Sequence, residues 1–297
     1  MKTFLPIAFA TLLAAAPLHG ASAETAVDRR LDAASDGTLD VNNVAGSIEV
    51  VGWDRNEVQV TGSLGDDVER LDFRRDGDRV IVAVVLRDDH RSVDDTRLTI
   101  NAPRKNDVEV RCVSANLNVR GIEGEQELSS VSGGIDTEAF ESAVSVNSVS
   151  GNVHIKGHGR ALLTRVKAVS GGLLLSDLAG QVEGSSVSGS VELTAATLER
   201  VQLNSVSGHV SLHTGLGDDS RIEVTTTSGA VTLLFDGTGA ADYELASFSG
   251  GIRNCFGPPV ASSGRPGPGQ QHHFTEGKSN ARVRANTMSG SIEVCRR

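Results

Sequence analysis

Apolar and polar residues alternate over short stretches of this chain, and the same stretch returns many times. Residues 147–155 read NSVSGNVHI, and close copies begin at Ser185 (SSVSGSVEL) and at Asn204 (NSVSGHVSL). When the glycine of each Ser-Gly pair is position zero, all eight copies have an apolar residue at +2 and six have one at +4. Position −2 is valine in five copies and threonine, phenylalanine or methionine in the rest. This period of two predicts a β-strand whose −2, +2 and +4 side chains face a core.

The eight Ser-Gly pairs are separated by 18 to 21 residues, except for 40 residues before the last pair. We predict that each glycine lies on the inward parity, between −2 and +2, where a missing side chain lets the opposite wall or the corner approach closely. The serine before it is predicted to face outward, where stacked hydroxyls can hydrogen-bond from copy to copy. A catalytic serine would be needed only once, so we interpret the pairs as structural. They are Ser132 with Gly133, Ser150 with Gly151, Ser170 with Gly171, Ser188 with Gly189, Ser207 with Gly208, Ser228 with Gly229, Ser249 with Gly250 and Ser289 with Gly290.

A second alternating segment precedes each pair, but on the other parity. In the copy that contains Gly208, the apolar residues Val201 and Leu203 stand at −7 and −5. The phase therefore changes before position −2, next to a small residue at −3 such as Ser205. A regular strand cannot change phase without a bulge or a bend, so we predict a corner that joins two strands in every unit.

One such unit cannot bury its apolar face, whereas a stack of units can. We therefore predict an all-β fold, a parallel β-solenoid (β-helix) of about ten coils with two main strands per coil. Equivalent residues would lie about 4.8 Å apart, and right-handed winding is expected because parallel crossovers are nearly always right-handed. Two further units, around Gly46 and Ala115, complete the ten.

The chain divides into three predicted parts. Residues 1–23 contain Lys2, an apolar run and then Ala21-Ser22-Ala23, which is typical of a secretory signal peptide cleaved after Ala23. Residues 24–107 hold the first unit and the strand-like runs EVQV, DRVIVAVVL and TRLTI, which indicate an N-terminal β cap. Residues 108–297 hold the remaining repeats. Within them, residues 257–281 are rich in Pro, Gly, Ser and Gln, which predicts a flexible loop.

The predicted register brings two of the three cysteines together. Cys255 and Cys295 each stand five residues after their glycine, Gly250 and Gly290, which would place them at equivalent positions of consecutive coils. A separation of about 4.8 Å suits a disulfide, and an exported chain meets oxidising conditions. We predict this disulfide, with a stabilisation of roughly 3–4 kcal/mol, as a bond that pins the final coil, which would end the stack with no successor to cover it. Cys112 replaces a small corner residue at −3 and is predicted to stay a buried free thiol.

Charge and composition narrow the possible partners. The formal charge is −10, and it is −11 without the signal peptide, which has one lysine and no acidic residue. Scattered acidic residues argue against nucleic acid or anionic lipid as a partner. No stretch after the signal peptide is apolar enough to form an integral membrane segment. We expect a periplasmic or secreted protein.

The sequence contains no pattern that indicates a catalytic or metal-binding site. His209 and His213 would lie about 13 Å apart on one strand, too far to share a zinc ion. Asp136 and Glu192 stand three coils apart, or roughly 14 Å, beyond the carboxylate separations of glycoside hydrolases. The GDD turns at residues 65–67 and 217–219 lack the alternating ligands of a calcium loop. We therefore expect no catalytic residue, no cofactor and no metal, and a protein that is not an enzyme.

The run LTINAPRKNDVEVRCVSANLNVRGIEGEQELSSVSGGIDT, with its strand, Pro and basic residue and later Ser-Gly-x-Ile/Val, resembles an exported bacterial family. This is the "putative adhesin" domain-of-unknown-function family with repeated β-strands. The resemblance covers residues 39–50 and 98–297 and implies a surface-attachment role, with no catalytic residue to carry over. The insertion before the last unit departs from the family pattern.

We favour a non-enzymatic exported scaffold or adhesin-like binding protein that presents a face of the solenoid to an unknown envelope protein or glycan. One alternative is an envelope β-helix protein that binds or cleaves polysaccharide. Another is a periplasmic accessory of a stress-sensing system.

Overall fold

The computed structural model describes residues 25–88, 94–160, 163–260 and 269–297, and all regular structure in them is β-strand. The 22 strands of these ranges belong to one hydrogen-bonded sheet system. They are β1 (Thr25–Asp32), β2 (Thr38–Trp53), β3 (Glu57–Leu64), β4 (Val68–Asp76), β5 (Arg79–Leu86), β6 (Thr96–Pro103), β7 (Asp107–Arg120), β8 (Gln126–Ser130), β9 (Ile135–Ala139), β10 (Val144–Ser150) and β11 (Val153–Gly157). The others are β12 (Leu163–Ser170), β13 (Leu173–Ser176), β14 (Gln181–Ser188), β15 (Val191–Ser207), β16 (Val210–Ser228), β17 (Val231–Asp236), β18 (Ala241–Ser249), β19 (Ile252–Asn254), β20 (Gln270–Glu276), β21 (Arg282–Ser289) and β22 (Ile292–Arg296).

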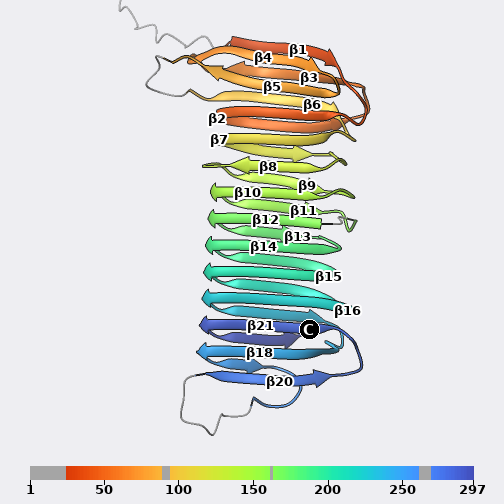
Figure 1. Ribbon diagram of the computed structural model, residues 1–297, viewed down its shortest axis with the longest axis vertical. Helices are drawn as coiled ribbons and strands as arrows, with labels where there is room; N and C mark the ends of the chain where they lie inside the picture. The colour runs from red at the N-terminus through yellow and green to blue at the C-terminus, as the bar shows by residue number, and fades with distance from the viewer. Residues whose placement is uncertain (1–24, 89–93, 161–162, 261–268) are drawn as a thin grey trace, which may run out of the picture.

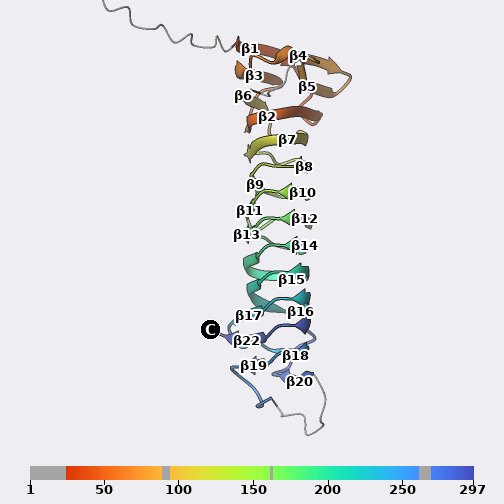
Figure 2. The same cartoon turned by 90° about the vertical axis from the view of Figure 1, so that its left-hand side faces the viewer.

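Each repeat unit contributes one strand to each of two parallel ladders, which run side by side along the stack (Figure 2). We call the ladder of strands that precede the corners the upstream ladder, and the other the downstream ladder. In the upstream ladder β10 pairs with β12 and β12 with β14, while in the downstream ladder β11 pairs with β13 and β13 with β15. The register aligns Ser150 with Ser170 and Ser170 with Ser188. The repeat alignment and its parallel pairing are therefore confirmed.

The core is a column of apolar side chains between the two ladders. Positions −7 and −5 of the upstream strands and +2 and +4 of the downstream strands are almost wholly buried, as Val201, Leu203, Val210 and Leu212 illustrate. The column continues from one coil to the next as a single apolar cluster. Each unit therefore buries its apolar face only by stacking on its neighbours, as expected for a repeat fold.

Position −2 faces solvent, and the prediction that it faces the core was wrong. The small residue at −3 continues the inward parity of −7 and −5, and Ser205, for example, is buried while Val206 is exposed. Both −2 and −1 then lie outside as the chain turns, and glycine occupies position zero of the corner. The change of phase is therefore a turn of the backbone around the small −3 residue.

The glycines at position zero lie in the bend between the two strands of each unit and face the adjacent coil. Seven of them are half-buried and Gly250 is exposed, so the prediction that they lie on the inward parity was wrong. The crowding predicted there is present, but a Cβ atom would overlap a backbone carbonyl oxygen of the neighbouring coil instead of the opposite wall. This holds for all eight repeat glycines: Gly133, whose neighbour is Ala115, and Gly151, Gly171, Gly189, Gly208, Gly229, Gly250 and Gly290, whose neighbours are themselves repeat glycines.

The serines at −1 are exposed, as predicted, but their hydroxyls form no ladder. None of the eight makes a side-chain hydrogen bond within the described ranges, whereas their backbone groups pair from coil to coil. Hydroxyls at −3 behave in two ways instead. Ser247 donates a hydrogen bond to the carbonyl oxygen of Gly290 at 2.8 Å, whereas Ser205 Oγ is buried with no partner.

This contrast predicts opposite effects for one substitution at equivalent positions. Ser205→Ala removes a buried, unpartnered hydroxyl and is expected to leave stability unchanged or raise it by up to about 1 kcal/mol. Ser247→Ala removes a hydrogen bond and is expected to cost about 1 kcal/mol. Urea denaturation of the two variants measures both, and a larger loss for Ser205→Ala than for Ser247→Ala would contradict this account.

At both ends of the stack, the order of the units differs from their order in the chain. β21 pairs with β16 on one side and β18 on the other (Figure 1). β22 likewise pairs with β17 and β19 (Figure 2). β2 likewise lies between β5 and β6 on one side and β7 on the other. The last unit of the chain is thus an interior unit, and the prediction that it ends the stack was wrong. The chain passes the end of the stack and returns, which explains the 40-residue spacing.

The charges on the upstream ladder fit this inserted order. Arg284 on β21 stands opposite Glu223 on one side and Glu244 on the other, and its Nη2 lies 2.6 Å from Glu244 Oε2. The carboxylate of Glu244 raises the pKa of Arg284. In chain order the two glutamates would be neighbours, and like charges directly opposite each other destabilise a sheet.

Antiparallel strands lie at the two ends of the stack. β1, β3 and β6 pair antiparallel at the N-terminal end, where a β cap was predicted, together with β4 on β5. At the other end β20 pairs antiparallel with β18, so the prediction of a flexible loop over residues 257–281 was wrong for residues 270–276. Phe274 of β20 stacks on Tyr243 at 4.6 Å and anchors the strand. Residues 261–268 of that loop and the predicted signal peptide lie outside the described residues.

Candidate binding surface

Exposed apolar side chains line up along one edge of the stack. They are the residues at −2, which we call the corner ridge: in order along the stack, Val113, Val131, Val149, Val169, Val187, Val206, Thr227, Met288 and Phe248. The eight large apolar members are 45–61% exposed. In the described ranges the only other exposed large apolar side chain is Leu174. Scattered exposed apolar residues are ordinary, whereas a continuous row of them marks an interaction site.

A groove follows the ridge. It has a volume of about 720 Å³ and is lined by residues at −4, −3 and −2 of successive units. Because the −3 residue between them is buried, the outward side chains at −2, such as Val169, and at −4, such as Asn147 and Lys167, stand on its two sides. The lining −2 residues span six units, from Val131 to Thr227, so the groove is roughly 24 Å long at the usual strand separation.

No acidic residue lines the groove. We call positions −4 to −1 of the nine ridge units the corner ribbon. Its segments are RCVS, SSVS, NSVS, KAVS, SSVS, NSVS, TTTS, NTMS and ASFS, without a single Asp or Glu, although the chain has 38 acidic residues. Its two charged residues are Arg111 and Lys167. An acidic protein therefore has one long neutral to basic strip on its surface.

Ion pairs occupy the neighbouring row at −6 instead. Arg165 lies 2.8 Å from Glu183, and at the N-terminal end Arg79 bridges Asp40 and Glu109 at 2.9 and 3.0 Å. The hydrogen bond from Arg79 lowers the pKa of Glu109, against the effect of partial burial. The charged side chains of this row are thus largely paired with one another and do not extend into the groove.

The residues considered for catalysis lie apart, as their sequence positions indicated. Asp136 and Glu192 are three steps apart in the downstream ladder, with His154 and Leu174 between them. His154 and His213 each pair with an aspartate, at 3.2 Å from Asp136 and 3.0 Å from Asp236. None of these groups contacts a serine hydroxyl of the repeat within the described ranges.

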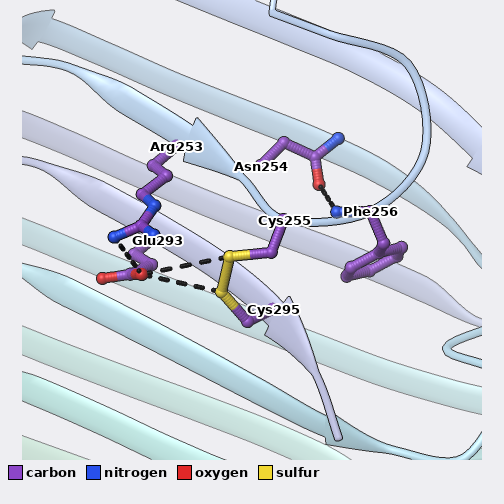
Figure 3. The surroundings of a disulfide bond; sticks show 6 residues. All are labelled: Arg253, Asn254, Cys255, Phe256, Glu293 and Cys295. Carbon is purple, nitrogen blue, oxygen red and sulfur yellow. Dashed lines mark hydrogen bonds and ion pairs between the residues drawn. A yellow bond between two sulfur atoms is a disulfide. The ribbon is translucent and has the colours of Figure 1, made fainter.

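The predicted disulfide is present. Cys255 and Cys295 are bonded with their Cα atoms 4.8 Å apart, the separation expected for stacked positions (Figure 3). Glu293 lies beside the two sulfurs and pairs with Arg253 at 3.1 Å. The two cysteines and Glu293 are the one cluster with metal-ligand spacing in the described ranges, and because both sulfurs are in a disulfide they are not thiolate ligands.

Cys112 is buried and free, as predicted. Burial in the corner raises the pKa of its thiol to about 12. The thiol is therefore protonated at neutral pH and a poor nucleophile.

Sequence reasoning missed a second hollow, on the turn side of the stack. The rings of Phe140 and His158 stack with centroids 4.3 Å apart, and Arg160 lies 2.8 Å from Glu141 beside them. With Lys105 these residues line a hollow of about 780 Å³. They come from turns of different units, which share no repeated motif, so no sequence pattern could have indicated the hollow.

The comparisons with known proteins identify the family. The family model described as "Toastrack DUF4097" matches residues 32–295. The chain belongs to this toastrack family. The resemblance read from the Ser-Gly repeat is thereby confirmed. Among curated proteins none matches the sequence.

Solved structures similar to this toastrack protein include three from Bacteroides and Parabacteroides. One is described as a "putative adhesin" from Bacteroides fragilis NCTC 9343, with 11% identity, 91% of this chain and 97% of that chain covered, and a TM-score of 0.46. A second, also described as a "putative adhesin", is from Parabacteroides distasonis ATCC 8503, with 12% identity, 91% and 98% coverage and a TM-score of 0.46. A "putative lipid binding protein" from the same strain has 12% identity, 91% and 96% coverage and a TM-score of 0.39. Within the described ranges, no helix has the length and apolar character needed to cross a bilayer.

Proposed function

We propose that this toastrack protein is an exported, non-enzymatic, adhesin-like binding protein: a β-solenoid rod, periplasmic or secreted, that presents its corner ribbon to a partner. The observation that carries the proposal is the corner ridge, which repeats one exposed and mostly apolar position along nine units. Folding does not require valine there, because the −2 side chain lies outside the core.

The surroundings of the ridge have the composition of a binding face. Charged residues are depleted from the cores of protein interfaces, and the corner ribbon has only two of them. A groove of about 720 Å³ along the ridge adds a concave surface. An elongated partner that follows the stack would meet the same chemistry at each coil.

The test compares two variants of one coil. Val169→Asp places a charge on the ridge, whereas Leu174→Asp places it on the downstream ladder at a side chain that is 42% exposed. Wild-type protein and both variants are immobilised and exposed to envelope extract, and captured partners are identified by mass. We expect Val169→Asp to lose at least tenfold of the captured material and Leu174→Asp to keep it. Equal capture by all three would contradict a ribbon-based function.

A second candidate is glycan binding at the hollow beside Phe140 and His158. Stacked rings beside an Arg–Glu pair offer a sugar both a π-face and hydrogen-bonding groups. A glycan array probed with wild type and His158→Ala tests it. Signals that His158→Ala does not weaken would exclude this hollow.

A further inference from the structure

The ridge and the groove lie next to each other and run in the same direction. Val131, Val149, Val169, Val187 and Val206 belong to both, as ridge members and as residues that line the groove. A ligand inside the groove would cover only one side of these valines. A partner that also carries a ridge would cover both sides, because its ridge could enter this groove while this ridge entered the partner's groove.

A second copy of the chain has such a ridge with the matching period. Its valines recur at the strand separation of about 4.8 Å, as they do here. A two-fold axis parallel to the stack brings the ridge of each copy opposite the groove of the other and keeps equivalent units at the same height. A two-fold axis across the stack would instead place ridge against ridge. The shape therefore favours two parallel copies in an isologous contact.

The distribution of charge on the surface also favours a second copy of the chain as the partner. Two copies of a chain with a formal charge of −10 repel each other over most of their surfaces. The corner ribbon lets them meet without bringing carboxylates together, because it contains no Asp or Glu. Asn and Ser side chains at −4 supply neutral donors and acceptors on both sides of such a contact.

The size of the ribbon sets the expected strength. Nine ridge units span roughly 38 Å along the stack, and four extended residues span roughly 13 Å across it. The product is roughly 500 Å² per copy, below the roughly 800 Å² of a standard stable interface. The contact is therefore expected to be weaker than a standard stable dimer and to depend on protein concentration.

We propose that the partner of the corner ribbon is a second copy of this chain, docked in parallel with each ridge in the other's groove. This inference rests on the proposed function, since it names the partner of the same surface.

Sedimentation velocity between about 1 and 200 μM tests the association on folded, full-length mature protein. We expect wild type and Leu174→Asp to shift from monomer to dimer, and Val169→Asp/Val187→Asp to stay monomeric with an unchanged melting temperature. A wild-type protein that stays monomeric throughout, or a double variant that still dimerises, would overturn the inference. If wild type is monomeric but Val169→Asp still loses captured envelope partners, the inference fails and the proposed function stands.

Cysteine cross-linking tests the direction of packing. Val131→Cys and Thr227→Cys stand at opposite ends of the groove, roughly 24 Å apart. In a parallel dimer each variant forms a disulfide with its own kind after mild oxidation, and a mixture yields no cross-linked heterodimer. A link found only in the mixture would show antiparallel packing and overturn the ridge-in-groove arrangement. The buried Cys112 thiol provides no competing site.

Discussion

Gly208→Val should lower the free energy of unfolding by about 3–5 kcal/mol, because a side chain has no space at the corner. A Cβ atom at this position would overlap the carbonyl oxygen of Gly189 and lie 2.8 Å from its carbonyl carbon. These are backbone atoms held by the parallel pairing of both ladders, so they cannot rotate away as a flexible side chain would. The backbone at Gly208 also has φ of +154°, which side-chain-bearing residues rarely adopt.

The matched control is Gly251→Ala, one position beyond a repeat glycine. A Cβ atom there would meet no atom within 4 Å, and the residue is exposed. Thermal and urea denaturation of both variants should show a large loss for Gly208→Val and a change of less than about 1 kcal/mol for Gly251→Ala. Equal stabilities for Gly208→Val and wild type would refute the crowded corner.

Replacing both Cys255 and Cys295 by serine should cost about 4 kcal/mol. The bond closes a segment whose ends are 40 residues apart, and the chain-entropy model gives this magnitude for such a loop. Because the disulfide ties the outer strand β19 to the interior strand β22, its loss should loosen the end of the stack first. Hydrogen exchange should accelerate in β18 and β19 well before β10 to β14.

Cys112→Ser serves as the control, because the unit next to it already has serine at the equivalent position, Ser130. It removes a thiol without touching the disulfide and should change stability by about 1 kcal/mol or less. Uniform acceleration of exchange along the whole stack in the double variant would contradict a local role for the disulfide.

The repeated positions predicted the strand pairing, since every coil adds another observation of the same register. Ser150, Ser170 and Ser188 align as expected, and Cys255 with Cys295 follows from the same count. The side on which −2 and the glycine lie could not be obtained in this way. An apolar residue in an alternating pattern normally indicates burial. Here the small serine at −3 is buried instead, and the valine that follows it at −2 is exposed.

The order of the units was also beyond the sequence pattern. Because the repeat units have similar sequences, each could pair with any other. The repeat pattern alone therefore cannot distinguish a unit at the end of the stack from one placed between two others. The charges at −6 could have indicated the true order. Arg284 separates Glu223 from Glu244 only when the last unit of the chain lies between the units of the two glutamates. β20 was missed because its anchor, Phe274, lies within a stretch whose composition indicated a loop.

The antiparallel strands at the two ends limit how a protein of this kind can grow. β20 covers the last upstream strand at one end, and β1, β3 and β4 continue the sheet in antiparallel pairing at the other, so a repeat added beyond these strands would meet a cap strand instead of a copy of its own unit. Internal duplication of an 18- to 21-residue unit avoids this problem and leaves both caps unchanged. Each such duplication adds one coil and, at the same time, one more exposed side chain to the corner ridge. The length of the rod and the length of its contact surface therefore increase together.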